Sequence, residues 1–362
     1  MHRPSTAERQ RSRIRALFLV LLVLTAPGVQ AQPLRPHASV GRGQPTSYTG
    51  VVSPDLRWAA SFGEQGALWL WNAATGQPVW TFPRPYGEQA RGGSARPLAF
   101  SPDGRLLAVA SANSSDVWVL EVPSARQVAH FVHGRKGRVA SPFGEYLRAG
   151  DFPAQVAFSP DGSVLAGEAN GHVIAWDVRS RDTLWSAWVR ADVPGRTSPE
   201  LVEDMAFQPG GGLLALATLS GTVELYDGRT GTPAGRLFVE HQDATSIAFS
   251  PDGTLVALDT CGQVDVWSMG ERLRVASLPV GRCGHQLAIS PDNRLLVGGS
   301  GYAGHHVWDL RSTEPVQVLY APEQPPSVLA YRFSADGTRL MELVGGGAYR
   351  VRTWAVSGEG AP

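Results

Sequence analysis

Few residues of this 362-residue chain have the types and spacing that catalytic or metal chemistry requires. The chain contains no HExxH zinc helix, no nucleophile elbow and no glycine-rich phosphate-binding loop. The neighbouring His305 and His306 are a weak metal candidate, because adjacent residues of a strand point to opposite faces and cannot share one ligand set. We therefore expect His305 and His306 to hold ordinary strand or turn positions. No cofactor, metal or catalytic residue is predicted from motifs.

Cys261 and Cys283 are the only cysteines, and they are the other residues with intrinsic reactivity. No cluster of further ligands flanks them, which argues against a metal or redox role. An even number of cysteines in an exported chain favours a disulfide. A Cys261–Cys283 bond would close a loop of about 23 residues and stabilise the fold by roughly 3 kcal/mol in the chain-entropy model.

The first 31 residues have the pattern of a signal peptide. Five arginines against Glu8 give this segment a net charge of +4, which leaves −4 on the remainder of the neutral chain. The apolar run Ala16–Ala26 is shorter than the roughly 20 residues of a membrane span, and Val29-Gln30-Ala31 suits cleavage after Ala31. We expect residues 1–31 to be removed and the protein to be exported, to the periplasm or outside the cell. An uncleaved anchor remains the alternative.

Seven copies of a short Ser-Pro-Asp-Gly-like turn, each preceded by small or apolar residues, organise the rest of the chain. Repetition at about 40–50 residues indicates one supersecondary unit used many times, and it governs the architecture. The seven copies are Val51–Leu56, Ala99–Gly104, Ala157–Gly162, Ala206–Gly211, Ala248–Gly253, Ala288–Asn293 and Arg332–Gly337.

Each unit predicts four antiparallel strands. The turn serine, or its equivalent, precedes an aromatic (Leu120 in the second unit) by 17 to 20 residues, which fits three strands joined by tight turns. Another turn follows, as in Asn72–Gly76, and then a fourth strand such as Pro78–Phe82, Gln127–Phe131 or Arg274–Leu278. Seven such units predict an all-β, seven-bladed β-propeller over residues 32–362.

The third strands resemble those of the WD-repeat family, which end in Trp-Asp. The pairs that carry the resemblance are Trp176-Asp177 and Trp308-Asp309, with the variants Trp71-Asn72, Tyr226-Asp227 and Trp267-Ser268. The resemblance covers about residues 50–356 and is that of an exported bacterial type with degenerate repeats. Family members often carry a His before the first strand and an Asp before the third. Only His241 and Asp116 approach these positions, so we expect apolar packing, more than polar networks, to hold the blades.

The last unit is incomplete, because only Ala355–Pro362 follows Trp354. Residues Pro36–Arg42 contain a plausible strand that could supply the missing one. We predict that this N-terminal strand completes the final blade and closes the ring, which removes exposed strand edges.

Long inserts point to a binding face. They are Pro83–Pro97, Val132–Ala154 and Val189–Asp204, and the resemblance places them on one face of the propeller. Such loops on a rigid scaffold often bind partners, and arginine and aromatic residues are favoured interface anchors. The candidate partner-binding residues are Arg84, Tyr86, Arg91, Arg135, Lys136, Arg138, Phe143, Tyr146 and Phe152. A solvated variable loop with no partner is the alternative reading.

These features predict a non-catalytic scaffold or adaptor that binds a protein or another envelope macromolecule, as a monomer. Nucleic acid is not an expected partner, since the charge near −4 and the export signal argue against it. Cys261 and Cys283 would both reach the insert-bearing face, in keeping with a disulfide. The turn Asp residues recur in one role and indicate folding.

An enzyme is the alternative function. Propeller hydrolases of the lactonase type share the architecture and place acid–base or metal-binding residues around the central channel. The candidates at the strand entrances are Asp151, Glu203, Asp204, Asp243 and His285. The turns also resemble those of the periplasmic Tol propeller, although no separate N-terminal domain of that kind fits before Val51. Asn72–Trp80 resembles the Trp-docking motif of quinoproteins, but it is well formed only once, so no quinone cofactor is expected.

Overall fold

The computed structural model describes residues 34–40, 49–62, 67–82, 97–111, 116–133, 155–189, 199–238, 244–280, 286–300, 304–319, 327–345 and 350–356. The chain divides into two compact units, Met1–Gln32 and Pro33–Pro362, and all described residues belong to the second. Within them, no helix has the length and apolar character needed to cross a membrane.

The described residues form 28 strands in seven four-stranded antiparallel sheets, which are the blades. Blade 1 contains β2 (Gly50–Val52), β3 (Trp58–Phe62), β4 (Leu68–Asn72) and β5 (Pro78–Phe82). Blade 2 contains β6 (Leu98–Phe100), β7 (Leu106–Ala110), β8 (Asp116–Glu121) and β9 (Gln127–Val132). Blade 3 contains β10 (Gln155–Phe158), β11 (Val164–Ala169), β12 (His172–Asp177) and β13 (Thr183–Trp188).

The second half of the chain continues the pattern. Blade 4 contains β14 (Val202–Phe207), β15 (Leu213–Thr218), β16 (Thr222–Asp227) and β17 (Pro233–Phe238). Blade 5 contains β18 (Ser246–Phe249), β19 (Leu255–Asp259), β20 (Gln263–Ser268) and β21 (Leu273–Pro279). Blade 6 contains β22 (Gln286–Ile289), β23 (Leu295–Ser300), β24 (Gly304–Asp309) and β25 (Glu314–Val318). Blade 7 contains β26 (Ser327–Phe333), β27 (Arg339–Gly345), β28 (Arg350–Val356) and β1 (Leu34–Val40).

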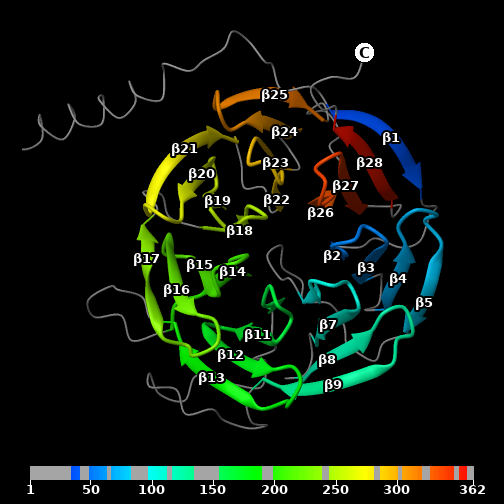
Figure 1. The fold of residues 1–362 in the computed structure, drawn as a ribbon, viewed down its shortest axis with the longest axis vertical. Helices are drawn as coiled ribbons and strands as arrows, with labels where there is room; N and C mark the ends of the chain where they lie inside the picture. The colour runs from blue at the N-terminus through cyan, green and yellow to red at the C-terminus, as the bar shows by residue number, and fades with distance from the viewer. Residues whose placement is uncertain are drawn as a thin grey trace, which may run out of the picture. The chain divides into compact units, whose positions relative to one another are not determined.

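The seven blades form a closed ring. The first strand of each blade contacts the first strands of both neighbouring blades, from β2 through β6, β10, β14, β18, β22 and β26 back to β2. These strands lie nearest the centre of the ring, and the fourth strands lie at its rim (Figure 1). The predicted seven-bladed, all-β architecture is confirmed.

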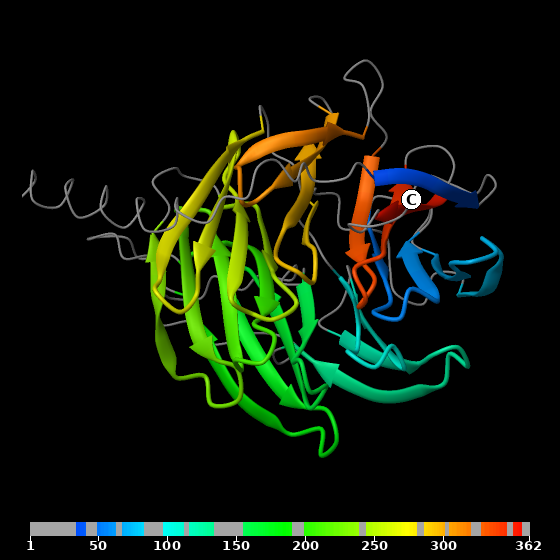
Figure 2. The same ribbon diagram turned by 45° about the horizontal axis from the view of Figure 1, so that its top comes forward.

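Blade 7 joins the two ends of the described chain. Strand β1 pairs antiparallel with β28, from Leu34 opposite Val356 to Val40 opposite Val351. Figures 1 and 2 show the blue β1 alongside the red β28 at the rim. The predicted closure is confirmed, with the strand beginning two residues before Pro36.

A glutamine side chain of blade 6 also binds β1 through hydrogen bonds. Gln317 of β25 donates from Nε2 to the carbonyl oxygen of Leu34 at 2.9 Å, and its Oε1 accepts from the Leu34 N–H at 2.5 Å. The Leu34 side chain is buried at 2% exposure. Both polar groups of one backbone residue are thereby satisfied by one amide side chain, which fixes the start of β1.

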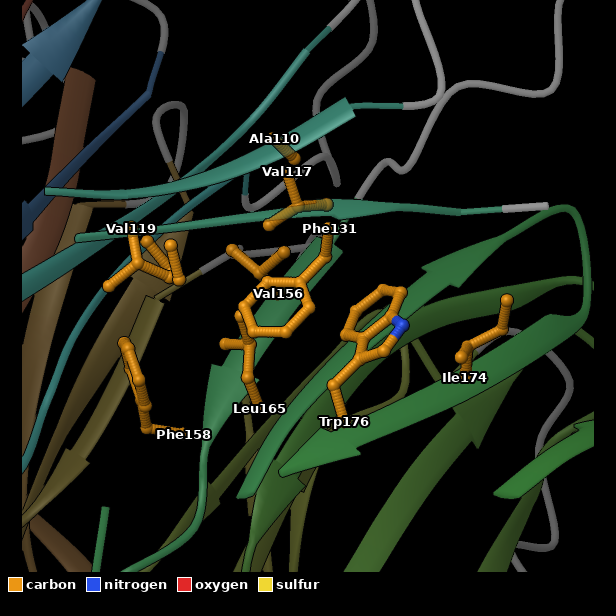
Figure 3. Close-up of a cluster of buried hydrophobic side chains, with 11 residues drawn as sticks. Ala110, Val117, Val119, Phe131, Val156, Phe158, Leu165, Ile174 and Trp176 are labelled. Atoms are coloured by element: carbon orange, nitrogen blue, oxygen red, sulfur yellow. The ribbon is translucent and has the colours of Figure 1, made fainter. Parts of the chain in front are cut away.

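Apolar side chains between neighbouring blades make the cores. Between blades 2 and 3, Phe131 stacks on Trp176 with ring centroids 5.2 Å apart (Figure 3). Val119 and Leu165 fill the same interface, and each fully buried side chain of this size contributes about 1.5–3 kcal/mol. Because every blade buries both faces, the second strands show continuous burial, as in Val164–Ala169.

The Ser-Pro-Asp-Gly turns have one hydrogen-bonding plan. In six blades the turn serine donates its hydroxyl to the Asp two residues on, at 2.5–2.6 Å, and accepts the N–H five residues on, at 2.8–2.9 Å. In blade 4 Gln208 replaces the serine and donates to the carbonyl of Gly253 in the next turn, at 2.7 Å. There a Cβ on Gly253 would lie 2.0 Å from the Pro209 carbonyl oxygen, so only glycine fits.

Candidate functional site

Most of the predicted partner-binding segments lie outside the described residues. This applies to all nine candidate partner-binding side chains, which are Arg84, Tyr86, Arg91, Arg135, Lys136, Arg138, Phe143, Tyr146 and Phe152. It also applies to Cys283 and to the hydrolase candidates Asp151, Asp243 and His285. The described residues do not test the predictions that concern these side chains.

The two ends of the ring differ in how they are built. One end carries the Ser-Pro-Asp-Gly turns between first and second strands; we call it the turn face. The other end carries the connections from each fourth strand to the next blade and the turns between second and third strands; we call it the insert face. The described residues that flank the long inserts, His133, Val189 and Glu200, are all buried there.

A group of oxygen-bearing side chains lies on the insert face between blades 3 and 4. We call the side chains of Gln155, Glu168 and Glu203, with the backbone carbonyl of Val202, the blade 3–4 mouth. Gln155 opens β10 and is directly opposite Glu168 of β11, so both side chains leave the sheet on the same side. Gln155 Nε2 donates to the carbonyl oxygen of Val202 at 3.1 Å, which brings its amide to the first strand of blade 4.

The carboxyl group of Glu168 has a raised pKa. It is 1% exposed, and burial raises its pKa to about 8, against a lowering by the hydrogen bond from the Gly171 N–H at 2.7 Å. The carboxyl of Glu203, across the blade boundary, raises this pKa further. The mouth therefore pairs a buried carboxyl with a second, partly exposed one.

The turn after β11 supports one end of an insert. Gly171 has φ +82°, and a Cβ there would lie 2.2 Å from the Glu200 carbonyl oxygen. Gly171 accepts the Val189 N–H at 2.8 Å, and Val189 accepts the Glu200 N–H at 2.9 Å. Glu200 Oε1 in turn accepts the Ser220 N–H of blade 4 at 2.9 Å. Both residues that flank the insert 190–198 are thus fixed to regular elements.

Asp204 and Glu203, two of the hydrolase candidates, lie at different blade boundaries: Asp204 contacts blade 5, and Glu203 belongs to the blade 3–4 mouth. Asp204 is fully buried, and its Oδ2 accepts the Ile247 N–H of blade 5 at 2.8 Å. Glu203 is the extra residue of an irregularity in β14, where Val202 is opposite Thr218 and Asp204 is opposite Ala217. These two acids do not converge on one reacting centre. Asp204 acts as a link between neighbouring inner strands.

Two histidines occupy the boundary between blades 2 and 3. His133 Nε2 donates to the His172 carbonyl oxygen at 3.0 Å, and its ring lies edge-on to those of His172 and Trp176. His172 stacks on Trp188 with centroids 4.6 Å apart. Burial lowers the pKa of both imidazoles to about 4, and for His133 the neighbouring His172 is a further cause. Both rings are neutral at pH 7.

The other histidine pair behaves as the strand periodicity predicts. His305 is buried against Tyr331, with ring centroids 5.8 Å apart, whereas His306 stacks on Trp308 at 5.5 Å. Because the two rings contact different partners, they do not form a shared ligand set. Among the described residues, no three His, Cys, Asp or Glu side chains group at metal-binding distance.

Several tryptophans make polar contacts that the sequence did not predict. Trp71 donates to Ser61 Oγ at 3.3 Å in blade 1, and Trp354 donates to Glu342 Oε2 at 3.2 Å in blade 7. Trp80, from the segment that resembles a Trp-docking motif, donates to the Pro123 carbonyl of blade 2 at 2.9 Å. The expectation of mainly apolar packing holds for the cores, but polar links from indole nitrogens supplement it.

Comparisons with known proteins agree with this geometry. A family model described as the anaphase-promoting complex subunit 4 WD40 domain matches residues 54–141. The guanine nucleotide-binding protein subunit beta of Oryza sativa subsp. japonica is 23% identical over 324 residues, which cover 84% of this chain and 79% of that protein. The target of rapamycin complex subunit wat1 of Schizosaccharomyces pombe is 24% identical over 178 residues, 46% of this chain and 51% of that protein. The chain is a WD-repeat β-propeller.

The signature Asp of this WD-repeat propeller has a local structural role. Asp177 Oδ1 accepts the N–H groups of Arg179 and Ser180 at 3.0 and 2.8 Å, which caps the turn into the fourth strand. Asp227 does the same in blade 4, and Asn72 substitutes for it in blade 1. An amide or carboxylate oxygen suffices for this turn, which explains why the family signature tolerates Asn here.

The histidine pair predicts an acid-sensitive propeller. The folded-state pKa values near 4 lie below the ordinary 6.5, so the unfolded chain binds more protons between pH 6.5 and pH 4. The stabilisation is complete above pH 6.5 and declines as the pH falls toward 4, by roughly 3 kcal/mol for His133 alone. Urea unfolding at a series of pH values measures this slope.

His133→Phe is the matched variant, because it keeps a ring against Trp176 and removes the titrating group. We expect this variant to lose some stability at every pH and to show a shallower decline below pH 6.5. Equal slopes for the two proteins would contradict the assignment.

Proposed function

We propose that this WD-repeat propeller is a non-catalytic scaffold that binds another protein through its insert face. The observation that carries the proposal is the contrast between the two faces. On the turn face, six of seven turns repeat one hydrogen-bond pattern. On the insert face, the described residues differ from blade to blade, and all three long inserts connect there.

The turn face uses its polar groups internally. Hydrogen bonds from Ser334 and Thr338 lower the pKa of Asp336 to about 2, and those from Ser159 and Ser163 lower the pKa of Asp161. These carboxylates are ionised and already accept bonds within their own turns. Variation at the insert face, on a scaffold that is otherwise regular, is the pattern expected of a binding surface.

The relatives support a protein as the partner. Their printed names describe them as a subunit of a guanine nucleotide-binding protein and a subunit of the target of rapamycin complex. We propose the same general kind of activity for this chain, with the nine Arg, Lys, Tyr and Phe residues of the inserts as the anchors.

Export and the disulfide belong to the same proposal. The signal-like segment 1–31 supports secretion to the periplasm or the exterior, where cysteines oxidise. Cys261 lies in the turn between β19 and β20 on the insert face, and its N–H donates to Asp259 Oδ1 at 3.0 Å. We propose that it pairs with Cys283, in the connection to blade 6, and so fastens that connection to blade 5.

Charge reversal tests the binding face. We expect Arg135→Glu, Lys136→Glu and Arg138→Glu together to reduce capture of the partner at least about tenfold, because arginine anchors dominate binding energy. The measurement is cross-linking and capture from the envelope and secreted fractions of the source organism, followed by binding of the purified partner.

The matched control reverses three arginines on the turn face: Arg57→Glu, Arg105→Glu and Arg339→Glu. All three are exposed beside their turns, so the change in net charge is the same. Equal capture by wild type and the insert variant, or an equal loss in the control, would remove the case for the insert face.

Processing is tested on the purified exported protein. We expect an intact mass that begins at Gln32, and cysteines that resist alkylation until a reductant is added, because both are oxidised. A chain that retains residues 1–31 would contradict cleavage, and immediate alkylation of both cysteines in the folded protein would contradict the disulfide.

A further inference from the structure

The blade 3–4 mouth gathers three oxygen-bearing side chains from three strands. Gln155 and Glu168 are opposite each other on β10 and β11, and both face blade 4, the side to which Ala166 and Val164 also contribute core contacts. Gln155 reaches the Val202 carbonyl, and Glu203 is the next residue along β14.

The Gln155 side chain presents an unused acceptor at this place. It is 2% exposed, and within the described part of the chain its Oε1 has no hydrogen-bond partner. A flipped amide would set this oxygen against the Val202 carbonyl oxygen, so the hydrogen bond from Nε2 fixes its orientation. Leaving a buried acceptor unsatisfied costs about 1–3 kcal/mol, which points to a ligand that the oxygen serves.

Glu203 is the extra residue of a backbone irregularity. In the pairing of β14 with β15, Val202 and Asp204 are opposite consecutive residues of β15, so Glu203 is an extra residue in the ladder. Such bulges redirect a side chain and recur next to functional sites. In a regular ladder, the residue before Asp204 would be directly opposite a residue of β15.

The carboxyl groups of the mouth have no cationic partner among the described residues. Neither Glu168 nor Glu203 forms an ion pair with a described residue, although one is buried and the other lies beside it. Two buried acids elsewhere in the propeller do have cations: Asp265 has Arg274 at 3.3 Å, and Asp309 has Arg294 at 3.1 Å. Burying an ionised carboxyl group without a counter-charge is costly, and a cation bound beside Glu168 would offset this cost.

We propose that the blade 3–4 mouth binds a divalent cation of the Ca²⁺ type, with Gln155 Oε1 and the carboxyl groups of Glu168 and Glu203 as its protein ligands. Carboxylate and amide oxygens are hard donors, which suit Ca²⁺ and Mg²⁺. Ca²⁺ fits better, because it accepts irregular coordination geometry, whereas Mg²⁺ demands a near-ideal octahedron. Glu203 is partly exposed, so water can supply the remaining ligands. Zinc sites are built mainly from Cys and His, and His133 packs at the opposite boundary, against Trp176.

The cation would link two blades at the base of an insert. Glu168 also holds Gly171, and Gly171 contacts the backbone at Val189 and Glu200. Binding would therefore fasten the ends of segment 190–198 to blades 3 and 4. This inference is independent of the partner proposal, since ion binding is measured on the isolated propeller.

The test is calcium titration of the exported chain after EDTA treatment, near pH 8. We expect one site by calorimetry, with affinity in the 10⁻⁴–10⁻³ M range typical of extracellular modules. At about 5 mM CaCl₂ the melting temperature should rise by about 2–4 °C, and MgCl₂ should give a smaller rise. Glu168→Gln and Glu203→Gln should each weaken binding at least about tenfold.

Two controls make the result decisive. Glu121→Gln removes an exposed carboxylate that bonds Arg126 near the turn face, and it should bind Ca²⁺ as wild type does. Glu168→Gln keeps an acceptor for the Gly171 N–H, so it should fold, and its melting temperature without Ca²⁺ checks this. No heat and no thermal shift in the wild type would overturn the proposal, because a water or a partner's basic side chain would then serve Gln155. Equal shifts in all four proteins would overturn it too.

Discussion

Closure of the ring by the pairing of β1 with β28 is the constraint on which the rest of this structure depends. Each blade buries both faces against its neighbours, so an open stack would leave two apolar faces and unpaired edges exposed. The register from Leu34 opposite Val356 to Val40 opposite Val351 prevents this, and Gln317 fixes the start of β1 with two hydrogen bonds. With the circle closed, the seven inner strands acquire fixed neighbours, and groups such as Gln155 and Val202 meet across blade boundaries.

Within the closed ring, the two faces are shaped by different requirements. The turn face must bring the chain back in four or five residues, and a Ser–Asp hydrogen bond with a glycine at positive φ meets that need repeatedly. The insert face has no such uniform requirement, because connection lengths vary from blade to blade. Polar side chains there make individual links, as when Asp204 joins blade 5 and Glu200 joins Ser220. Both the proposed partner surface and the proposed cation site lie on this less constrained face.

The architecture could be predicted from the sequence, because repetition multiplies a weak local signal. One Ser-Pro-Asp-Gly turn predicts little, but seven such turns at a regular period predict the blades, because six of them are followed by an aromatic such as Trp176. The same count predicts that the last blade lacks a strand, which the segment near Pro36 supplies. The blade 3–4 mouth could not be predicted in this way. The sequence indicates Glu203 only as one of several acids near the channel entrance. Its grouping with Gln155 and Glu168 depends on strand register and on one extra residue in β14. The same extra residue places Glu203 and Asp204 at different blade boundaries. The polar partners of Trp71 and Trp354 could not be predicted, because Ser61 and Glu342 lie on the second strand and meet the indoles only through the pairing of second and third strands.

Amide hydrogen exchange of blade 7 tests the closure most directly. The measurement compares β28 in the native chain with β28 in a variant whose residues 34–40 are replaced by a Gly-Ser sequence of equal length. The account predicts that native β28 exchanges as slowly as the interior strand β12, and that in the variant β28 exchanges at the rate of an exposed edge while the melting temperature falls. Equal protection of β28 in both proteins, with unchanged melting, would contradict closure by β1.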